Sequence, residues 1–217
     1  MKILAFDTCL DKMYVAIGDE NEVLCSKIVE TTQKNYHSAY LISTIASLLE
    51  ESKLTPKDLD VVATNIGPGS FTGIRACTTV ARVMAQSTKT KTVGVSSLEI
   101  LSKINTTDKK TLVALDARKE MAYVSIFEAG QAILAPQSIL LENLKEMLKA
   151  EDYFVVTDDK LQQIIGGVSY QQEPYPLGEF LLKISANKVK DASFDSSWQK
   201  LLPLYIQPPA LHVKKAT

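Results

Sequence analysis

The sequence predicts an α/β protein made of two related units, and three observations support this prediction. Short apolar segments typical of buried strands alternate with segments of helical periodicity. The second half repeats the first at a shift of 109 positions, which aligns residues 3–7 with 112–116 and residues 14–17 with 123–126. Five of the 15 positions between residues 3 and 17 are then identical. The order of strand, Asp, strand, turn, strand and helix also recurs, which indicates a duplicated α/β unit.

Length and charge limit the possible classes of protein. The chain has 217 residues, and the repeat divides it into expected lobes at residues 1–105 and 106–217. With 24 Lys and Arg against 25 Asp and Glu, the net charge is −1. The chain therefore lacks the positive surface potential of a protein that binds nucleic acid by itself. Three Cys without a C-x-x-C spacing, and no apolar segment of membrane-spanning or signal-peptide length, favour a cytoplasmic protein.

The chain begins with three expected strands. The apolar run at residues 3–6 ends at Asp7 and predicts a strand that is buried on both faces. Residues 13–17 and 23–29 are further strands on either side of a turn at residues 18–21. So short a turn predicts antiparallel pairing of these two strands.

A long helix is expected next, at residues 36–51. Leu41, Ile45, Leu48 and Leu49 fall at i, i+4, i+7 and i+8 and form one apolar stripe. The adjacent face carries mostly small side chains, which permit close approach of another helix. Packing within the chain and binding of a partner are equally good explanations of that face.

Strands and helices then alternate along the rest of the chain. Before a polar link at residues 105–110, we expect a strand at 60–66, a helix at about 71–86 and a strand at 92–95. A further helix should begin at Ser96 or Ser97, where Glu99 completes an N-terminal capping pattern. After the repeated strands, we expect a helix at 141–149, a strand at 153–157, a helix at 176–187 with Pro near its start, and an extended, frayed segment at 193–217.

The most specific motif is Gly-Pro-Gly-Ser-Phe-Thr-Gly-Ile-Arg, which joins a strand to a helix. Its glycines permit positive φ and close backbone approach, Ser70 or Thr72 can cap the helix, and the free amides of the first helical turn favour an anion. The motif lacks the ending of a P-loop and the spacing of the dinucleotide fingerprint. We therefore favour a tight turn with a packed Phe71, and a phosphate site is the alternative. The loop residues concerned are Gly67, Pro68, Gly69, Ser70, Phe71, Thr72, Gly73 and Arg75.

The first hairpin is a second candidate phosphate site. Asp7 and Thr8 follow a buried strand, where nucleotide phosphates and Mg²⁺ could sit. That role needs amides close to the phosphate, usually at glycines, and the hairpin has none, so we favour Asp7 as a turn-capping residue with Asp116 as its counterpart. No metal site is predicted, because His37 lacks a second ligand at i±3 or i±4 and a Cys such as Cys77 is more often a core residue.

Several of these segments resemble the bacterial TsaB (YeaZ) family. They are ILAFDT at residues 3–8, HSAYL at 37–41, GPGSFTGIR at 67–75, VSSLE at 95–99, ALDARKEMAYVSIF at 114–127, and LPLYIQP at 202–208. The resemblance implies the actin-like (ASKHA, ribonuclease H-like) fold, with two related lobes that are each built on a mixed sheet flanked by helices. The chain departs from the family at Cys9, where Ser is usual, and in a second lobe that is short.

The resemblance also implies a function. TsaB-like proteins take part in making N6-threonylcarbamoyladenosine at position 37 of tRNAs that read ANN codons, but they are not the catalyst. They pair with TsaD, an actin-like paralogue that transfers the threonylcarbamoyl group from its adenylate to tRNA. The ATPase TsaE joins this pair, and TsaC or its longer variant makes the adenylate. We therefore expect no cofactor on this chain, which would meet tRNA only through the complex.

The expected pairing surface comes from the first two helices of the N-terminal lobe. In the family, these helices form a bundle with TsaD, and the same surface supports a homodimer when the partner is absent. The residues that this resemblance assigns to the surface are Tyr36, Ala39, Tyr40, Ser43, Ala46, Ser47, Thr79, Val80 and Val83.

Two other functions stay open from the sequence. An ATP-dependent small-molecule kinase of the same fold is one alternative, although the glycine-free first hairpin argues against it. A protease or chaperone-like partner of the paralogue is the other, and no Ser/His/Asp or metal constellation supports it.

Overall fold

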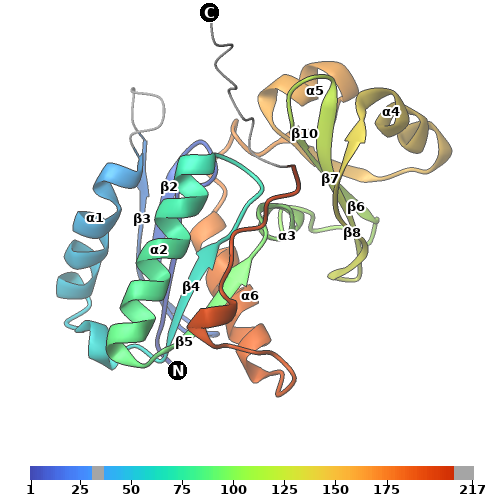
Figure 1. Ribbon diagram of the computed structural model, residues 1–217. Helices are drawn as coiled ribbons and strands as arrows, with labels where there is room; N and C mark the ends of the chain where they lie inside the picture. Colours follow the sequence, from blue (N-terminus) through green and yellow to red (C-terminus); the bar gives the residue numbers. More distant parts are fainter. Residues whose placement is uncertain (31–36, 208–217) are drawn as a thin grey trace, which may run out of the picture.

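Two five-stranded sheets form the frame of the computed structural model, which describes residues 1–30 and 37–207 (Figure 1). The first sheet has the order β3-β2-β1-β4-β5, and β1 lies at its centre, antiparallel to β2 and parallel to β4. Its strands are β1 (Ile3–Asp7), β2 (Met13–Gly18), β3 (Val23–Val29), β4 (Val61–Asn65) and β5 (Lys91–Val95).

The second sheet repeats this arrangement strand for strand. Its order is β8-β7-β6-β9-β10, and its central strand β6 is antiparallel to β7 and parallel to β9. The strands are β6 (Thr111–Asp116), β7 (Met121–Glu128), β8 (Gln131–Leu140), β9 (Phe154–Thr157) and β10 (Val168–Ser169). The predicted duplication and the actin-like fold class with two mixed sheets are therefore confirmed.

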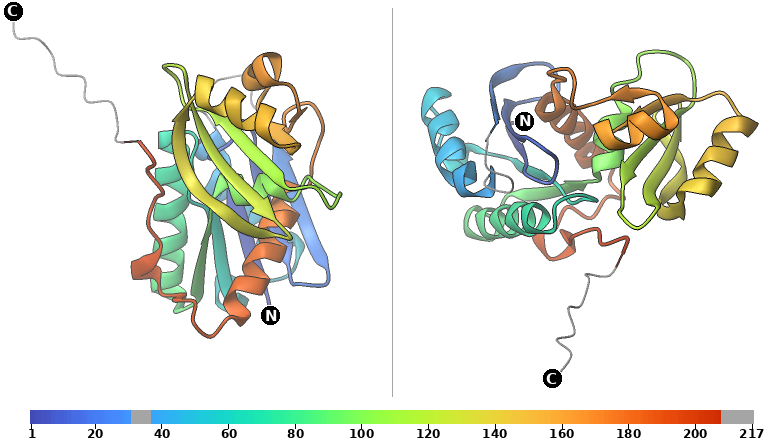
Figure 2. Two further views of the ribbon diagram at one scale, coloured as in Figure 1. Left: turned by 90° about the vertical axis from the view of Figure 1, so that its right-hand side faces the viewer. Right: turned by 90° about the horizontal axis from the view of Figure 1, so that it is seen from above.

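Helices form three layers around the two sheets (Figures 1 and 2). The outer face of the first sheet is covered by α1 (His37–Glu51) and α2 (Phe71–Thr88), and the outer face of the second by α4 (Leu141–Ala150) and α5 (Asp159–Ile165). Between the sheets lie α3 (Ser97–Ser102) and α6 (Leu177–Lys190). Two 3-10 turns, η1 (Pro56–Asp58) and η2 (Trp198–Lys200), complete the elements.

Apolar side chains fill each of these layers. Leu41, Ile45, Leu48 and Leu49, the predicted stripe of α1, are all buried in the cluster that also contains Leu4 and Phe6 of β1. The cluster around α3 and α6 includes residues of both sheets, such as Ala5 and Val113. The two lobes therefore share one hydrophobic core, which fixes them to each other.

The C-terminal part of the chain returns to the first sheet. The boundary expected near residue 105 separates the two sheets, but α6 packs on β1, β2 and β5. Beyond it, the Ser196 carbonyl accepts the Thr92 amide at 2.8 Å, and the Leu204 amide donates to the Ile66 carbonyl at 2.8 Å. A sheet with an uncovered inner face and an exposed edge strand needs such a cover, and residues 177–204 supply it.

The expected elements occur with small shifts of their ends, and three short elements were not expected. Two of them are α5, which Asp158 caps by accepting the Leu161 amide at 2.9 Å, and β10. The segment expected to be extended from residue 193 contains η2. Tyr36 and residues 208–217, for which a helix start and a frayed end were predicted, lie outside the described residues.

In the two described ranges, no helix combines the length and the apolar character needed to cross a membrane.

Because α6 packs between the two sheets, shortening one of its buried side chains should greatly lower the free energy of unfolding. Leu181 is fully buried in the cluster shared by the two sheets. Leu181→Ala should lower the free energy of unfolding by about 2–5 kcal/mol, because the substitution leaves a cavity. The matched control is Ile133→Ala on β8, where the side chain is exposed and the expected change is within about 0.5 kcal/mol. Urea unfolding measures both, and equal effects would contradict the position of α6.

Candidate functional site

The glycine-rich loop is held by hydrogen bonds to the elements on either side of it. Asn65, at the end of β4, accepts the Gly67 amide on its Oδ1 at 2.8 Å. The Ser97 amide, at the start of α3, donates to the Gly67 carbonyl at 2.9 Å, and the Ser97 hydroxyl donates to the Pro68 carbonyl at 2.6 Å. Gly67 has φ +102°, which favours glycine. The loop thus joins β4 to α3 as well as to α2.

Two of the glycines let the loop lie directly on the first hairpin. A side-chain carbon at Gly73 would overlap the Thr8 carbonyl, and one at Gly69 would overlap the Cys9 carbonyl. At the same contact, the Ser70 amide donates to the Cys9 carbonyl at 2.8 Å. Close approach of two backbone segments therefore accounts for these glycines without a phosphate.

Several amides of the hairpin and of the helix start donate to groups within the protein. The Thr8 amide donates to the Cys77 sulfur at 3.1 Å, and the Cys9 amide donates to Asp7 Oδ1 at 2.5 Å. Ser70 caps α2 by accepting the Gly73 amide at 3.3 Å, so Ser70 rather than Thr72 is the capping residue. These bonds favour the tight-turn interpretation over a phosphate cradle.

Phe71 differs from its expected packing. Its side chain is 42% exposed and stacks on Tyr205, with ring centroids 5.3 Å apart. The Arg75 guanidinium lies 5.5 Å from the centroid of the Phe71 ring. The C-terminal segment supplies the stacking partner, so sequence reasoning about the loop alone could not place this ring.

Asp7 is buried at the centre of the site. Burial raises the pKa of Asp7 to about 6, although the hydrogen bond from the Cys9 amide acts in the opposite direction. That bond is the predicted turn cap. The counterpart Asp116 likewise accepts the Arg118 amide, at 3.3 Å, and its other oxygen pairs with Lys160 at 2.7 Å.

The β6–β7 turn beside Asp116 is strained. Arg118, Lys119 and Glu120 have φ of 65°, 49° and 59°, a region that residues other than glycine rarely adopt. The turn is held by hydrogen bonds between Met121 and its neighbours on the hairpin. No residue of this turn was among the predicted site residues, because strain has no sequence signature when glycine is absent.

α1 and α2 lie side by side on the outer face of the first sheet (Figure 1), and their exposed side chains include small and apolar ones. On α1, Tyr40 is 49% exposed and Ile42 is 67% exposed, and Val83 on α2 is 59% exposed. Ile42 was not predicted, although its i, i+4 relation to Ala46 places it on the same face. Of the described residues assigned to the pairing surface, Val80 is half-buried, and the others are exposed: Ala39, Tyr40, Ser43, Ala46, Ser47, Thr79 and Val83.

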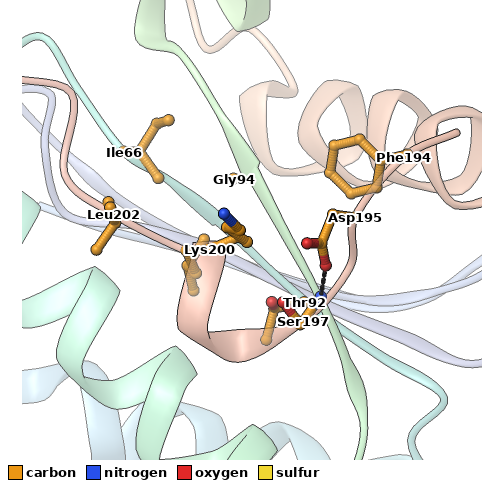
Figure 3. A pocket seen from close by; sticks show the side chains of 9 residues that line it. Ile66, Thr92, Gly94, Phe194, Asp195, Ser197, Lys200 and Leu202 are labelled. Atoms are coloured by element: carbon orange, nitrogen blue, oxygen red, sulfur yellow. Dashed lines mark hydrogen bonds between the residues drawn. The ribbon is translucent and has the colours of Figure 1, made fainter.

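A small cavity lies at the edge of the first sheet, between β5 and the C-terminal segment (Figure 3). Its volume is about 130 Å³, and its walls include Gly94 and Leu201. Asp195 stabilises the segment by accepting the Ser197 amide at 3.0 Å. Pockets for small-molecule ligands usually measure about 300–1,000 Å³, so this cavity is a packing feature of the edge.

Known proteins resemble this chain in both sequence and fold. Residues 24–160 match the family model described as TsaD: tRNA N6-adenosine threonylcarbamoyltransferase. The tRNA threonylcarbamoyladenosine biosynthesis protein TsaB of Bacillus subtilis is 32% identical over 158 residues, which cover 70% of this chain and 68% of that protein. The chain belongs to the TsaB family. Members of this family act in tRNA threonylcarbamoyladenosine biosynthesis.

Other TsaB relatives agree with this assignment. The protein of the same name from Buchnera aphidicola subsp. Schizaphis graminum is 34% identical over 124 residues, covering 56% of this chain and 58% of the relative. The solved structure of YeaZ from Pseudomonas aeruginosa has a TM-score of 0.78 and 23% identity, covering 94% of this chain and all of that chain. This second likeness supports the fold.

The contact of the loop with the hairpin predicts an unusual response to adding a methyl group. Gly→Ala inside a helix normally stabilises by up to about 1 kcal/mol. Gly73→Ala should instead destabilise by about 2 kcal/mol or more, because the new carbon overlaps the Thr8 carbonyl. Gln86→Ala, at an exposed position of the same helix, is the control with an expected change within about 0.5 kcal/mol. A stabilised Gly73→Ala variant in urea unfolding would rule out the contact.

Proposed function

We propose that the chain is a noncatalytic subunit that pairs with a TsaD-like subunit through the outer face of α1 and α2. The complex would make N6-threonylcarbamoyladenosine at position 37 of tRNAs that read ANN codons. The observation that carries this proposal is the exposed apolar and small face of α1 and α2. That face supports pairing because the inward stripe of α1 already fills its own core, which leaves Tyr40, Ile42 and Val83 outside it.

The size of the side chains on this face fits a helix of a partner. Ala39, Ser43, Ala46 and Ser47 are small and exposed, so another helix can approach the backbone of α1 closely. Tyr40 and Ile42 lie among them and supply the kind of apolar anchors that dominate interface energies. A paralogue with the same lobe would present a matching pair of helices, and two copies of this chain could use the same face as a homodimer.

A noncatalytic role is supported by the hydrogen bonds and the close packing of the first hairpin. Its amides at Thr8 and Cys9 donate to Cys77 and Asp7, and the loop at Gly73 occupies the space against the Thr8 carbonyl. Nucleotide phosphates bind to free amides at glycines, which this hairpin does not offer. We therefore assign ATP and metal chemistry of the reaction to the TsaD-like and TsaE-like partners, and tRNA contact to the whole complex.

A cytoplasmic location belongs to the same proposal. Cys9, Cys25 and Cys77 are all free thiols, as expected in a reducing compartment.

Charge placed on the pairing face should break the complex. Ser43→Arg or Ala39→Arg should weaken binding to the TsaD-like subunit by roughly 30-fold or more, because a buried unpaired charge costs at least about 2 kcal/mol. Ala150→Arg, at an exposed position on α4, is the matched control and should bind like the unchanged chain. Calorimetric titration measures the affinities of the three variants and of the unchanged chain. Unchanged binding of both α1 variants would remove this interface.

Reconstitution tests the role in the reaction. The chain is mixed with a TsaD-like subunit, a TsaE-like ATPase, the threonylcarbamoyl adenylate and tRNA, and modified adenosine is measured with and without it. The proposal predicts modification only in the complete mixture, and equal modification without the chain would refute it. Titration of the isolated chain with Mg-ATP separates the kinase alternative, because micromolar binding would favour that alternative.

A further inference from the structure

Three side chains with metal-binding chemistry meet beneath the glycine-rich loop. A carboxylate oxygen of Asp7 and the sulfurs of Cys9 and Cys77 all lie within 4.8 Å of one another, and all three residues are buried. They come from the end of β1, the β1–β2 hairpin and α2. Cys25 does not belong to this group, because its thiol donates to the Leu48 carbonyl beneath α1.

The Asp7 carboxylate is only partly compensated for its burial. Its Oδ1 accepts the Cys9 amide, but its Oδ2 is buried and has no hydrogen-bond partner among the described residues. The buried Asn65 side-chain amide, which also has no hydrogen-bond partner among the described residues, lies close enough to Asp7 to offset part of the cost of burial but makes no hydrogen bond with Oδ2. A buried carboxylate oxygen normally has a donor or a cation beside it, so the missing partner points to a ligand.

The hydrogen bond to the Cys77 sulfur resembles those that orient metal ligands. The Thr8 amide donates to the Cys77 sulfur at 3.1 Å, and the Thr8 hydroxyl lies 3.2 Å from the same sulfur. An N–H donor of this kind fixes the direction of a thiolate, as hydrogen bonds to ligands do around a bound metal. The Cys9 thiol instead donates to the Asn65 carbonyl at 3.4 Å, and metal binding would replace this bond.

We propose that Asp7, Cys9 and Cys77 bind one thiophilic divalent cation of the Zn²⁺ class. Zn²⁺ takes Cys sulfur and Asp oxygen as ligands, and two sulfurs on one tetrahedral ion are about 3.8 Å apart, which is compatible with ligand atoms that lie within 4.8 Å of one another. The three side chains would fill three of the four positions of such an ion. On binding, each thiol releases its proton to solvent as the sulfur–metal bond forms, and no electron is transferred. The ion would tie α2 to the first hairpin below the α1–α2 face.

Cadmium provides the most direct test, because cadmium bound to thiolates absorbs in the ultraviolet. The full-length chain is freed of metal with a chelator, kept anaerobic so that its thiols stay reduced, and titrated with Cd²⁺. One equivalent of Cd²⁺ should saturate the charge-transfer band. A chain that develops no band, or a band that grows without a stoichiometric end point, would overturn the proposal without any variant.

Variants locate the site. Cys9→Ser and Cys77→Ser should each abolish the band, and Asp7→Asn should weaken binding by roughly tenfold or more, since even an outer-shell partner contributes that much. Cys25→Ser is the matched control, also buried in the first lobe, and should keep the band. Circular dichroism verifies that each variant is folded. Loss of the band in the folded Cys25→Ser variant, or its survival in folded Cys9→Ser, would assign the cation to other residues.

Zn²⁺ bound at the same site should stabilise the folded chain against unfolding. At a hundredfold excess over its Kd, Zn²⁺ should raise the Tm of the unchanged chain by roughly 5–10 °C and leave that of Cys77→Ser unaltered. An equal shift in both would mean that Zn²⁺ acts elsewhere. Failure of this test would leave the proposed pairing with a TsaD-like subunit untouched, since that pairing is measured with the α1 variants.

Discussion

The contact between the glycine-rich loop and the first hairpin determines the position of most of the first lobe. Gly69 and Gly73 lie against the carbonyls of Cys9 and Thr8 with no room for a side chain. This contact sets the start of α2 directly beside the end of β1. Because α2 packs against α1, the contact also fixes the outer face that the two helices present. A loop that looks suited to phosphate is used here to join backbone to backbone.

The second constraint is the cover that the C-terminal chain gives to the first sheet. Residues of α6 fill the space between the two sheets, and the following segment pairs with the edge strand β5 through Thr92. Tyr205 then reaches the loop and stacks on Phe71. The loop, the hairpin and the end of the chain thus form one connected unit, whereas α4 and α5 lie at the far end of the molecule (Figure 2).

Local patterns in the sequence were sufficient for most elements but not for contacts between distant segments. The stripe of Leu41, Ile45 and Leu48 predicted α1 because its period is intrinsic to the helix, and the repeat predicted the second sheet. The helix α5 was missed because seven residues are too few to show a period. The return of α6 and the exposure of Phe71 depend on tertiary packing, as does the meeting of Cys77 with Asp7, so no local pattern could reveal them.

The most direct test of the proposed pairing is hydrogen exchange of this chain with and without a purified TsaD-like subunit. The account predicts slower exchange of amides in α1 and α2 on complex formation, because these helices would become buried in the interface. Exchange in α4 and β8, at the opposite end of the molecule, should stay unchanged. Protection confined to α4 and β8, or no protection of α1 and α2 in a complex shown to form, would contradict the account.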